Sequence, residues 1–245
     1  MKPYTTNKIN RIKKAIDKAL ESGAQPIAAF DADGTLWDMD MGENFFHYQI
    51  KNKLLPDLPT DPLNYFQIKC EKNNADAFLW LVQINKNRTL DEIKKWAREA
   101  FDAHEPIPLF AGVKEIVTHL QKLNVKIFIV TASMKWAVEP AAELLGIPSD
   151  AIIGVTTIIK NGVLTSEPEG HMTWQEGKAI RLLDKIAPHA PFFCAGNTMG
   201  DLALLETATH IRLANCALPL GHAAYPSEQK LIEVAKSRNW FYHSF

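Results

Sequence analysis

Two aspartates one residue apart give this sequence its clearest chemical feature. The segment Phe30-Asp31-Ala32-Asp33-Gly34 leads from an apolar stretch into two carboxylates and then a glycine. Residues two apart face the same side of a strand, so Asp31 and Asp33 can address one site. Gly34 lets the backbone turn sharply and approach a phosphate closely. The pattern predicts a carboxylate nucleophile beside its own general acid, although a solvated turn or a calcium loop would also have it.

Three later segments carry polar groups that fit the same chemistry. An apolar run ends at Thr131, Lys178 follows a Glu-Gly pair, and Asn197 and Asp201 follow the apolar run 192–195. Together with the first segment, and in this order, they resemble the four motifs of the haloacid dehalogenase superfamily in its phosphatase form. Many relatives carry Asp at the position of Asn197.

The resemblance implies a role for each catalytic residue. Asp31 would attack phosphorus and form an aspartyl-phosphate, which water then hydrolyses. Asp33 would protonate the leaving alcohol and later take a proton from water; the dehalogenase branch lacks this second aspartate. Thr131 would donate its hydroxyl to a phosphate oxygen, and Lys178 would offset the charge of the phosphoryl group and of Asp31.

The resemblance also implies a Mg²⁺ cofactor. Its ligands would be a carboxylate oxygen of Asp31, the backbone carbonyl of Asp33 and the side-chain oxygen of Asn197, together with waters. Asp201 would be a further ligand through water or a group that orients the others. Magnesium prefers oxygen ligands and retains several waters, so a site with few protein ligands suits it.

Further residues are candidates for substrate binding. Those expected near the phosphate are Gly34, Thr35, Ala132, Ser133 and Thr198. Glu43 is preceded by Trp37 and followed by Phe45, Phe46 and Tyr48, so it could bind a quaternary ammonium through charge and cation-π contact. Equally, those phenylalanines could be core residues and Glu43 a helix-capping residue. Arg98 could bind a substrate carboxylate as in phosphoserine, or could be a solvated helix residue.

Strands and helices are expected to alternate along most of the chain. The predicted strands are 27–31, 125–131, 191–195 and 210–213, the predicted helices are 113–123, 136–145 and 176–186, and Asn161-Gly162 predicts a hairpin. This order favours an α/β fold with a doubly wound, Rossmann-like parallel sheet. An N-terminal helix with Ile9, Ile12, Ile16 and Leu20 on one face would cover that sheet, or alternatively form a basic membrane anchor.

Residues 38–108 break this alternation and are rich in helical pattern, with a capping box at Thr89-Leu90-Asp91-Glu92. In the family, a helical insertion at this place is a cap domain that selects the substrate. We therefore expect a cap at 38–108 and an α/β core domain formed by 1–37 and 109–245. The helical cap, the hairpin and the Gly-Lys third motif are most similar to phosphoserine phosphatase and its relatives, whereas Ala132-Ser133 and Gly200 depart from that branch.

Composition narrows the class of protein. The formal net charge of −1 gives no general attraction to nucleic acid or to acidic membranes. Three separated cysteines favour free thiols in a reducing compartment, and no signal-like or membrane-length apolar run is found, so we expect a cytoplasmic protein. We expect a monomer, or a dimer if the cap has an apolar surface. The function expected is a Mg²⁺-dependent phosphatase of a small phosphorylated metabolite. Open alternatives are a phosphocholine or phosphoethanolamine phosphatase, a phosphotransferase, and a phospho-ligand binding protein.

Overall fold

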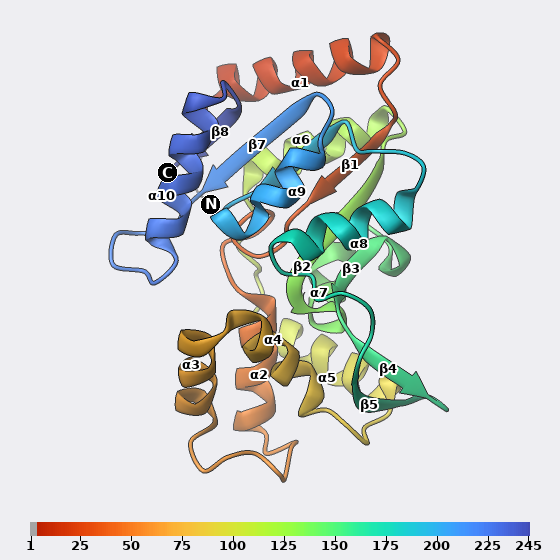
Figure 1. The fold of residues 1–245 in the computed structure, drawn as a ribbon, viewed down its shortest axis with the longest axis vertical. Coiled ribbons are helices and arrows are strands. Elements are labelled where there is room, and N and C mark those ends of the chain that lie inside the picture. Colours follow the sequence, from red (N-terminus) through yellow and green to blue (C-terminus); the bar gives the residue numbers. More distant parts are fainter. Residues whose placement is uncertain (1–3) are drawn as a thin grey trace.

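A parallel sheet forms the centre of the molecule in the computed structural model, which describes residues 4–245 (Figure 1). Its six strands lie in the order β3-β2-β1-β6-β7-β8, and every neighbouring pair is parallel. The bounds are β1 Ile27–Phe30, β2 Lys126–Met134, β3 Ile152–Val155, β6 Phe193–Gly196, β7 Ile211–Cys216 and β8 Phe241–Ser244. The predicted doubly wound sheet is confirmed, and the edge strands β3 and β8 are additions to it. Residues 1–3, part of the expected core domain, lie outside the described residues.

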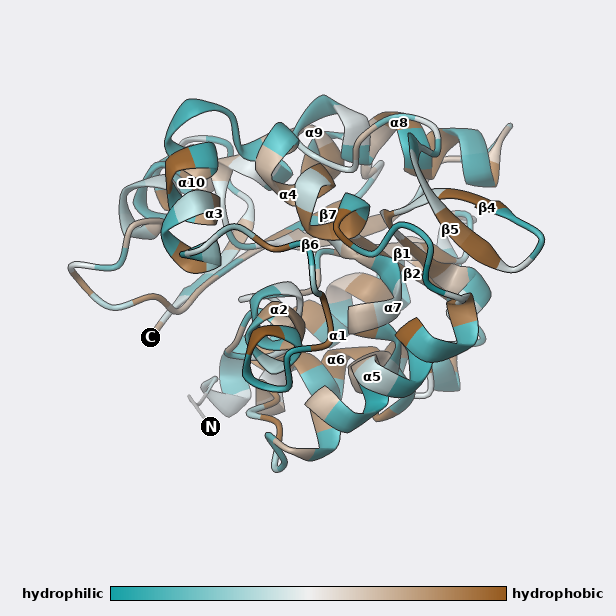
Figure 2. Ribbon diagram, turned by 90° about the horizontal axis from the view of Figure 1, so that it is seen from below, coloured by the Kyte–Doolittle hydropathy of each residue, from teal (hydrophilic) through white to brown (hydrophobic). Residues whose placement is uncertain are grey.

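Helices cover both faces of this sheet. Seen from below, α8 and α9 lie on one side of the strands and α1 and α6 on the other (Figure 2). The bounds are α1 Thr6–Glu21, α6 Ala111–Lys122, α7 Lys135–Glu143, α8 Glu176–Ile186, α9 Leu202–Thr207 and α10 Tyr225–Ser237. Ile9, Ile12 and Ile16 of α1 are buried in the core cluster, so the apolar stripe of this helix covers the sheet, as one of the two predictions had it.

The register of the central strands brings the chemical groups to one edge of the sheet. Phe30, the last residue of β1, pairs with Ile129 of β2 and with Ala195 of β6. The backbone N–H of Asp31 then donates to the Ala195 carbonyl at 2.9 Å. Because the strands are parallel, their carboxyl ends meet at this edge, and the residues that follow them become neighbours.

The segment between β1 and α6 is helical and lies beyond that edge, in the lower half of Figure 1. It contains α2 Met41–Lys51, α3 Pro62–Lys72, α4 Asn74–Gln83 and α5 Leu90–Asp102. The expected capping box is present: Thr89 accepts from the Glu92 N–H, and the Glu92 carboxylate accepts from the Thr89 N–H. The polypeptide enters and leaves this segment side by side, because Asp38 N–H donates to the Pro108 carbonyl at 2.9 Å.

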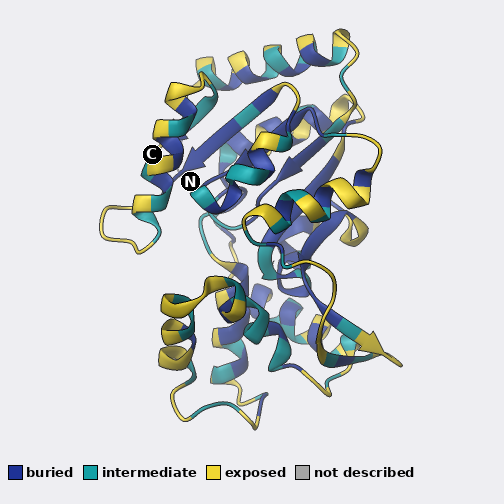
Figure 3. Cartoon of the chain, viewed as in Figure 1, coloured by how far each residue is buried: buried dark blue, intermediate teal, exposed yellow. Residues whose placement is uncertain are grey.

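A hairpin from the sheet domain joins this helical segment. It consists of β4 Thr157–Lys160 and β5 Val163–Pro168, with Asn161-Gly162 at its turn as expected. Leu164 accepts a hydrogen bond from the Asn87 N–H and donates one to the Arg88 carbonyl, both at 2.9 Å. Figure 3 shows buried residues running from the sheet into this region. Across residues 4–245, no helix is both long and apolar enough to cross a bilayer.

Candidate active site

A buried lysine lies between two aspartates at the carboxyl edge of the sheet. Lys178 Nζ is 2.6 Å from Asp31 Oδ1 and 2.5 Å from Asp201 Oδ1, and all three side chains are withdrawn from solvent. Asp31 follows β1, Lys178 lies in the first turns of α8, and Asp201 ends the short 3-10 helix Met199–Asp201. A β-carbon placed on Gly177 would be 1.7 Å from the Met172 carbonyl oxygen. The residue before Lys178 must therefore be glycine for the start of α8 to pack against the Met172 backbone.

Burial and charge act in opposite directions within this group. Burial and the Asp201 carboxylate raise the pKa of Asp31 to about 7, while the Lys178 ammonium opposes the rise. Burial alone would lower the pKa of Lys178, but the carboxylates of Asp201 and Asp31 outweigh it and raise that pKa above its ordinary value. Lys178 therefore stays charged, and further positive charge beside Asp31 would favour the ionised form of Asp31.

Asp33 has surroundings that suit a general acid. Its Oδ1 accepts from the Trp37 indole N–H at 2.7 Å and the Met41 N–H at 3.0 Å, and its Oδ2 accepts from Ser133 Oγ at 2.6 Å. Desolvation and the charge of Asp40 raise the pKa of Asp33 to about 7, against the lowering effect of those three hydrogen bonds. A carboxyl with this pKa holds its proton near neutral pH, as a donor to a leaving alcohol must.

Hydroxyl groups complete the polar edge. Thr131 Oγ1 accepts from the Ser133 N–H at 3.0 Å, which leaves its own proton to donate elsewhere, and Thr173 donates to the Thr131 carbonyl. Thr35 Oγ1 donates to Asp31 Oδ2 at 2.9 Å. Thr35 and Ser133, both expected to bind substrate, thus also hold the two aspartates in place. Ala132, which lies between Thr131 and Ser133 in the sequence, is partly exposed.

Asn197 lies against the turn that follows Asp33. A β-carbon placed on Gly34, whose φ is +75°, would be 2.1 Å from Asn197 Nδ2. The amide nitrogen donates to Glu228 Oε1 at 3.2 Å, and within residues 4–245 no hydrogen bond reaches the amide oxygen. Asn197 Oδ1, which lies 3.8 Å from the same β-carbon position, is therefore the amide atom left for a ligand.

These residues fit a magnesium ion better than a metal that needs a full protein cage. In the part of the chain that is described, no group of three or more His, Cys, Asp or Glu side chains is arranged to hold a metal. One carboxylate, one amide oxygen and one carbonyl form a sparse set of hard oxygen donors, which matches an ion that retains its waters. Asp201 is already engaged, because its Oδ2 accepts from the N–H groups of Asn197 and Thr198, each at 3.0 Å, so it orients this loop.

The helical segment contributes two acidic groups whose charges interact with that of Asp33. Asp40 caps α2 by accepting from the Glu43 N–H at 2.8 Å. Desolvation and the Glu43 carboxylate raise the pKa of Asp40 to about 7, and desolvation and Asp33 raise the pKa of Glu43. Sequence reasoning named Glu43 but missed Asp40, whose only signal was its place just before an apolar helix.

Other residues of the predicted set lie elsewhere. Arg98 forms an ion pair with Glu143 of α7 and is not brought to the aspartates. Phe45 and Phe46 are buried in apolar clusters, as the core alternative had it. Trp37 is buried too and holds Asp33, a role that sequence reasoning missed.

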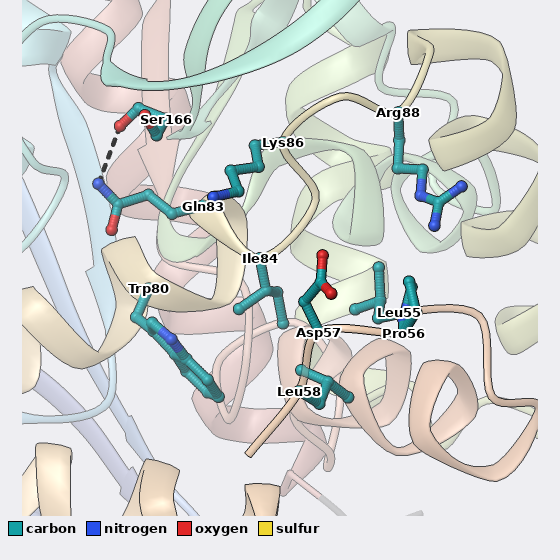
Figure 4. A pocket seen from close by; sticks show the side chains of 10 residues that line it. All are labelled: Leu55, Pro56, Asp57, Leu58, Trp80, Gln83, Ile84, Lys86, Arg88 and Ser166. Atoms are coloured by element: carbon teal, nitrogen blue, oxygen red, sulfur yellow. Dashed lines mark hydrogen bonds between the residues drawn. The ribbon is translucent and has the colours of Figure 1, made fainter.

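A separate cavity of about 320 Å³ lies within the helical segment near the hairpin, and its lining residues are drawn in Figure 4. Trp80, Ile84 and Leu58 form its apolar side, and Gln83 there donates to the Ser166 carbonyl at 2.9 Å. The cavity includes none of the residues that surround Asp31.

The fold is an α/β core with two aspartates and a lysine in contact at the carboxyl edge of its sheet. The family model of the haloacid dehalogenase-like hydrolases matches residues 28–206, and the chain belongs to this family. Within this family, the similarity to phosphatases described next supports a phosphoric monoester hydrolase.

Individual proteins are similar to this chain at sequence identities of 23% and below. A phosphorylcholine phosphatase of Pseudomonas aeruginosa is 23% identical over 237 residues, which cover 70% of this chain and 68% of that protein. A protein of unknown function from Bordetella pertussis has a TM-score of 0.72 at 19% identity, over 89% of this chain and 98% of its own. A substrate-bound phosphoserine phosphatase has a TM-score of 0.53 at 18% identity, over 86% of this chain and 97% of its own. These structures share the fold.

Proposed function

We propose that the protein is a Mg²⁺-dependent phosphatase that hydrolyses a small phosphate monoester through an aspartyl-phosphate at Asp31. The observation that carries this proposal is the pair of aspartates with different surroundings: Asp31 contacts an ammonium group, while Asp33 accepts hydrogen bonds from three neutral donors. The first is suited to act as a nucleophile and the second as an acid.

The reaction has two steps on these residues. An oxygen of Asp31 bonds to phosphorus while the bond from phosphorus to the alcohol oxygen breaks, and Asp33 gives its proton to that oxygen. A water molecule then bonds to phosphorus, the bond from phosphorus to Asp31 breaks, and Asp33 takes the proton of the water. Thr131 and Lys178 would hold phosphoryl oxygens throughout. Mg²⁺, held by Asp31, the Asp33 carbonyl and Asn197, would neutralise charge between the carboxylate and the phosphate.

We further propose that residues 38–108 act as the cap and that the substrate carries a cationic group. Asp40 and Glu43, at the start of α2, place two carboxylates near enough to Asp33 for their charges to interact with it. Arg98, the expected partner for a substrate carboxylate, is paired with Glu143 instead. This favours amino-alcohol phosphates without a carboxylate, such as phosphoethanolamine or phosphocholine, over phosphoserine. The similarity to a phosphorylcholine phosphatase supports the same choice.

The test is phosphate release from phosphoethanolamine, phosphocholine, phosphoserine and an aryl phosphate. Asp31→Asn and metal chelation should each abolish release, because one removes the nucleophile and the other the cation. The amino-alcohol phosphates should have higher kcat/KM values than phosphoserine. Release that survives in Asp31→Asn would refute the mechanism, and a preference for phosphoserine would refute the substrate class.

A phosphotransferase is distinguished in the same assay by an added acceptor alcohol. Transfer of the phosphoryl group to that alcohol in excess over water would replace the phosphatase proposal.

A further inference from the structure

The first turn of α10 is tied to the loop that carries Asn197. Asn197 Nδ2 donates to Glu228 Oε1 at 3.2 Å, and the Met199 N–H donates to Ser227 Oγ at 3.0 Å. The Cys216 thiol donates to the Asn197 carbonyl at 3.2 Å and also lies 3.6 Å from the Glu228 carbonyl. Glu228 has 0% exposed surface. Withdrawing a carboxyl group from water costs free energy, so a helix that only covered a sheet would gain more from an apolar residue here.

The contact between Glu228 and Asn197 determines how the amide is turned. Only the amide nitrogen can donate to a carboxylate, so Nδ2 must face Glu228. The carboxylate is itself held, because its Oε2 accepts from the Leu218 N–H at 2.9 Å. The amide nitrogen lies against both Glu228 and Gly34, and the amide oxygen, 3.8 Å from a β-carbon placed on Gly34, is the end left for a ligand.

We propose that Glu228 is a positioning residue of the cation site. It turns the oxygen of Asn197 toward the cation, and its carboxylate, one hydrogen bond away, supplies negative charge that a neutral amide ligand does not bring. The inference rests on the proposed Mg²⁺ site. It assigns a role to a carboxylate outside the four motifs and some thirty residues further along the chain.

Glu228→Gln tests both parts of this role with little change of volume. The new side chain can still accept from the Leu218 N–H through its oxygen, but its NH₂ group then faces the NH₂ group of Asn197. Two donors cannot bond, so the Asn197 amide should rotate and present its nitrogen to the cation. Loss of groups that orient a metal ligand costs about 10- to 100-fold in affinity, and we expect Mg²⁺ affinity to fall in this range.

Asn197→Asp provides the reciprocal change. Alone, it sets a carboxylate against Glu228 with no proton donor between them, so Tm without Mg²⁺ and affinity for Mg²⁺ should both fall. Combined with Glu228→Gln, the new carboxylate accepts from the new amide and offers a charged oxygen to the cation. The double variant should bind Mg²⁺ within about threefold of wild type, which is a strongly non-additive result.

The experiment is a Mg²⁺ titration by isothermal calorimetry of the wild type, both single variants and the double variant, with Tm measured in chelator and in Mg²⁺. Glu233→Gln, an exposed change on the same helix, is the control for lost charge and should bind as wild type does. Equal affinity of Glu228→Gln and wild type, or tighter binding by Asn197→Asp alone, would overturn the inference while the proposed function stands. Absence of binding by the wild type would overturn the Mg²⁺ proposal itself. If Glu228→Gln does not fold, the double variant decides, because weak binding by it contradicts the inference.

Discussion

At the scale of single residues, the site holds groups that suit catalysis at a cost in stability. The raised pKa of Asp33 means that the folded protein retains a proton that the unfolded chain releases at about pH 4. Between about pH 4 and pH 7 the unfolded chain therefore binds fewer protons than the folded one, and the free energy of unfolding decreases as pH rises. Above pH 7 Asp33 is ionised in both the folded and the unfolded protein, so its contribution to the free energy of unfolding no longer changes with pH.

Asp33→Asn should accordingly stabilise the metal-free protein at pH 8 while it abolishes turnover. The amide cannot ionise, and it retains acceptor and donor groups for the surrounding contacts. Because the Asp33 carboxyl is partly accessible and screened by solvent, we expect the substitution to raise the free energy of unfolding by about 1 to 2 kcal/mol. This corresponds to an increase in Tm of roughly 2 to 8 °C.

Thermal unfolding of both proteins at pH 5 and pH 8 measures this effect, and the gain should be larger at pH 8. Asp57→Asn, a charge change in an exposed loop, should leave the difference between the two pH values as in wild type. A gain of the same size at both pH values would contradict the linkage.

At the scale of elements, the sequence predicted the strands that carry the site better than their ends. β1, β2 and β6 were expected because long apolar runs mark buried parallel strands. The extension of β2 from Thr131 to Met134 was not expected, since polar residues there break the apolar run. That extension places Ser133 against Asp33, a contact between residues 100 positions apart that no local pattern encodes. For the same reason the sequence did not identify Glu228 or Asp40 as site residues. The ordered motifs, by contrast, predicted Asp31, Thr131, Lys178 and Asn197.

Ser133→Ala tests the role of the strand end. The Ser133 hydroxyl holds the pKa of Asp33 down, so its removal should raise that pKa and move the alkaline limb of the kcat/KM profile to higher pH. Loss of a single hydrogen bond is worth about 1 kcal/mol, which predicts a decrease in kcat of roughly 3- to 10-fold. A pH-rate profile measures both effects, and Ser149→Ala, far from the site, is the control. A reduced kcat with an unmoved limb would mean that Ser133 contacts the phosphate and does not act through Asp33.

At the scale of the whole molecule, the helical segment is attached to the sheet domain by more than the two stretches of chain that connect them. An apolar cluster unites Phe45 and Val82 of the segment with Trp136 of α7 and Leu164 of the hairpin. The backbone hydrogen bonds between the hairpin and the loop before α5 add to it. The sequence predicted the helical insertion but not this attachment, because the partners come from segments far apart in the chain.

This attachment predicts that the two parts unfold together. Leu164 is 1% exposed. Changing it to Ala should lower the free energy of unfolding by about 2 to 4 kcal/mol, because contacts are lost and a cavity is left behind. A single calorimetric transition should persist and move to lower temperature by roughly 4 to 16 °C, because the cluster contributes to both parts. Ile159→Ala, at a 37% exposed position of the same hairpin, should cost far less. If the transition of Leu164→Ala instead separates into two, with the core unfolding at the wild-type temperature, the helical segment is an independent unit.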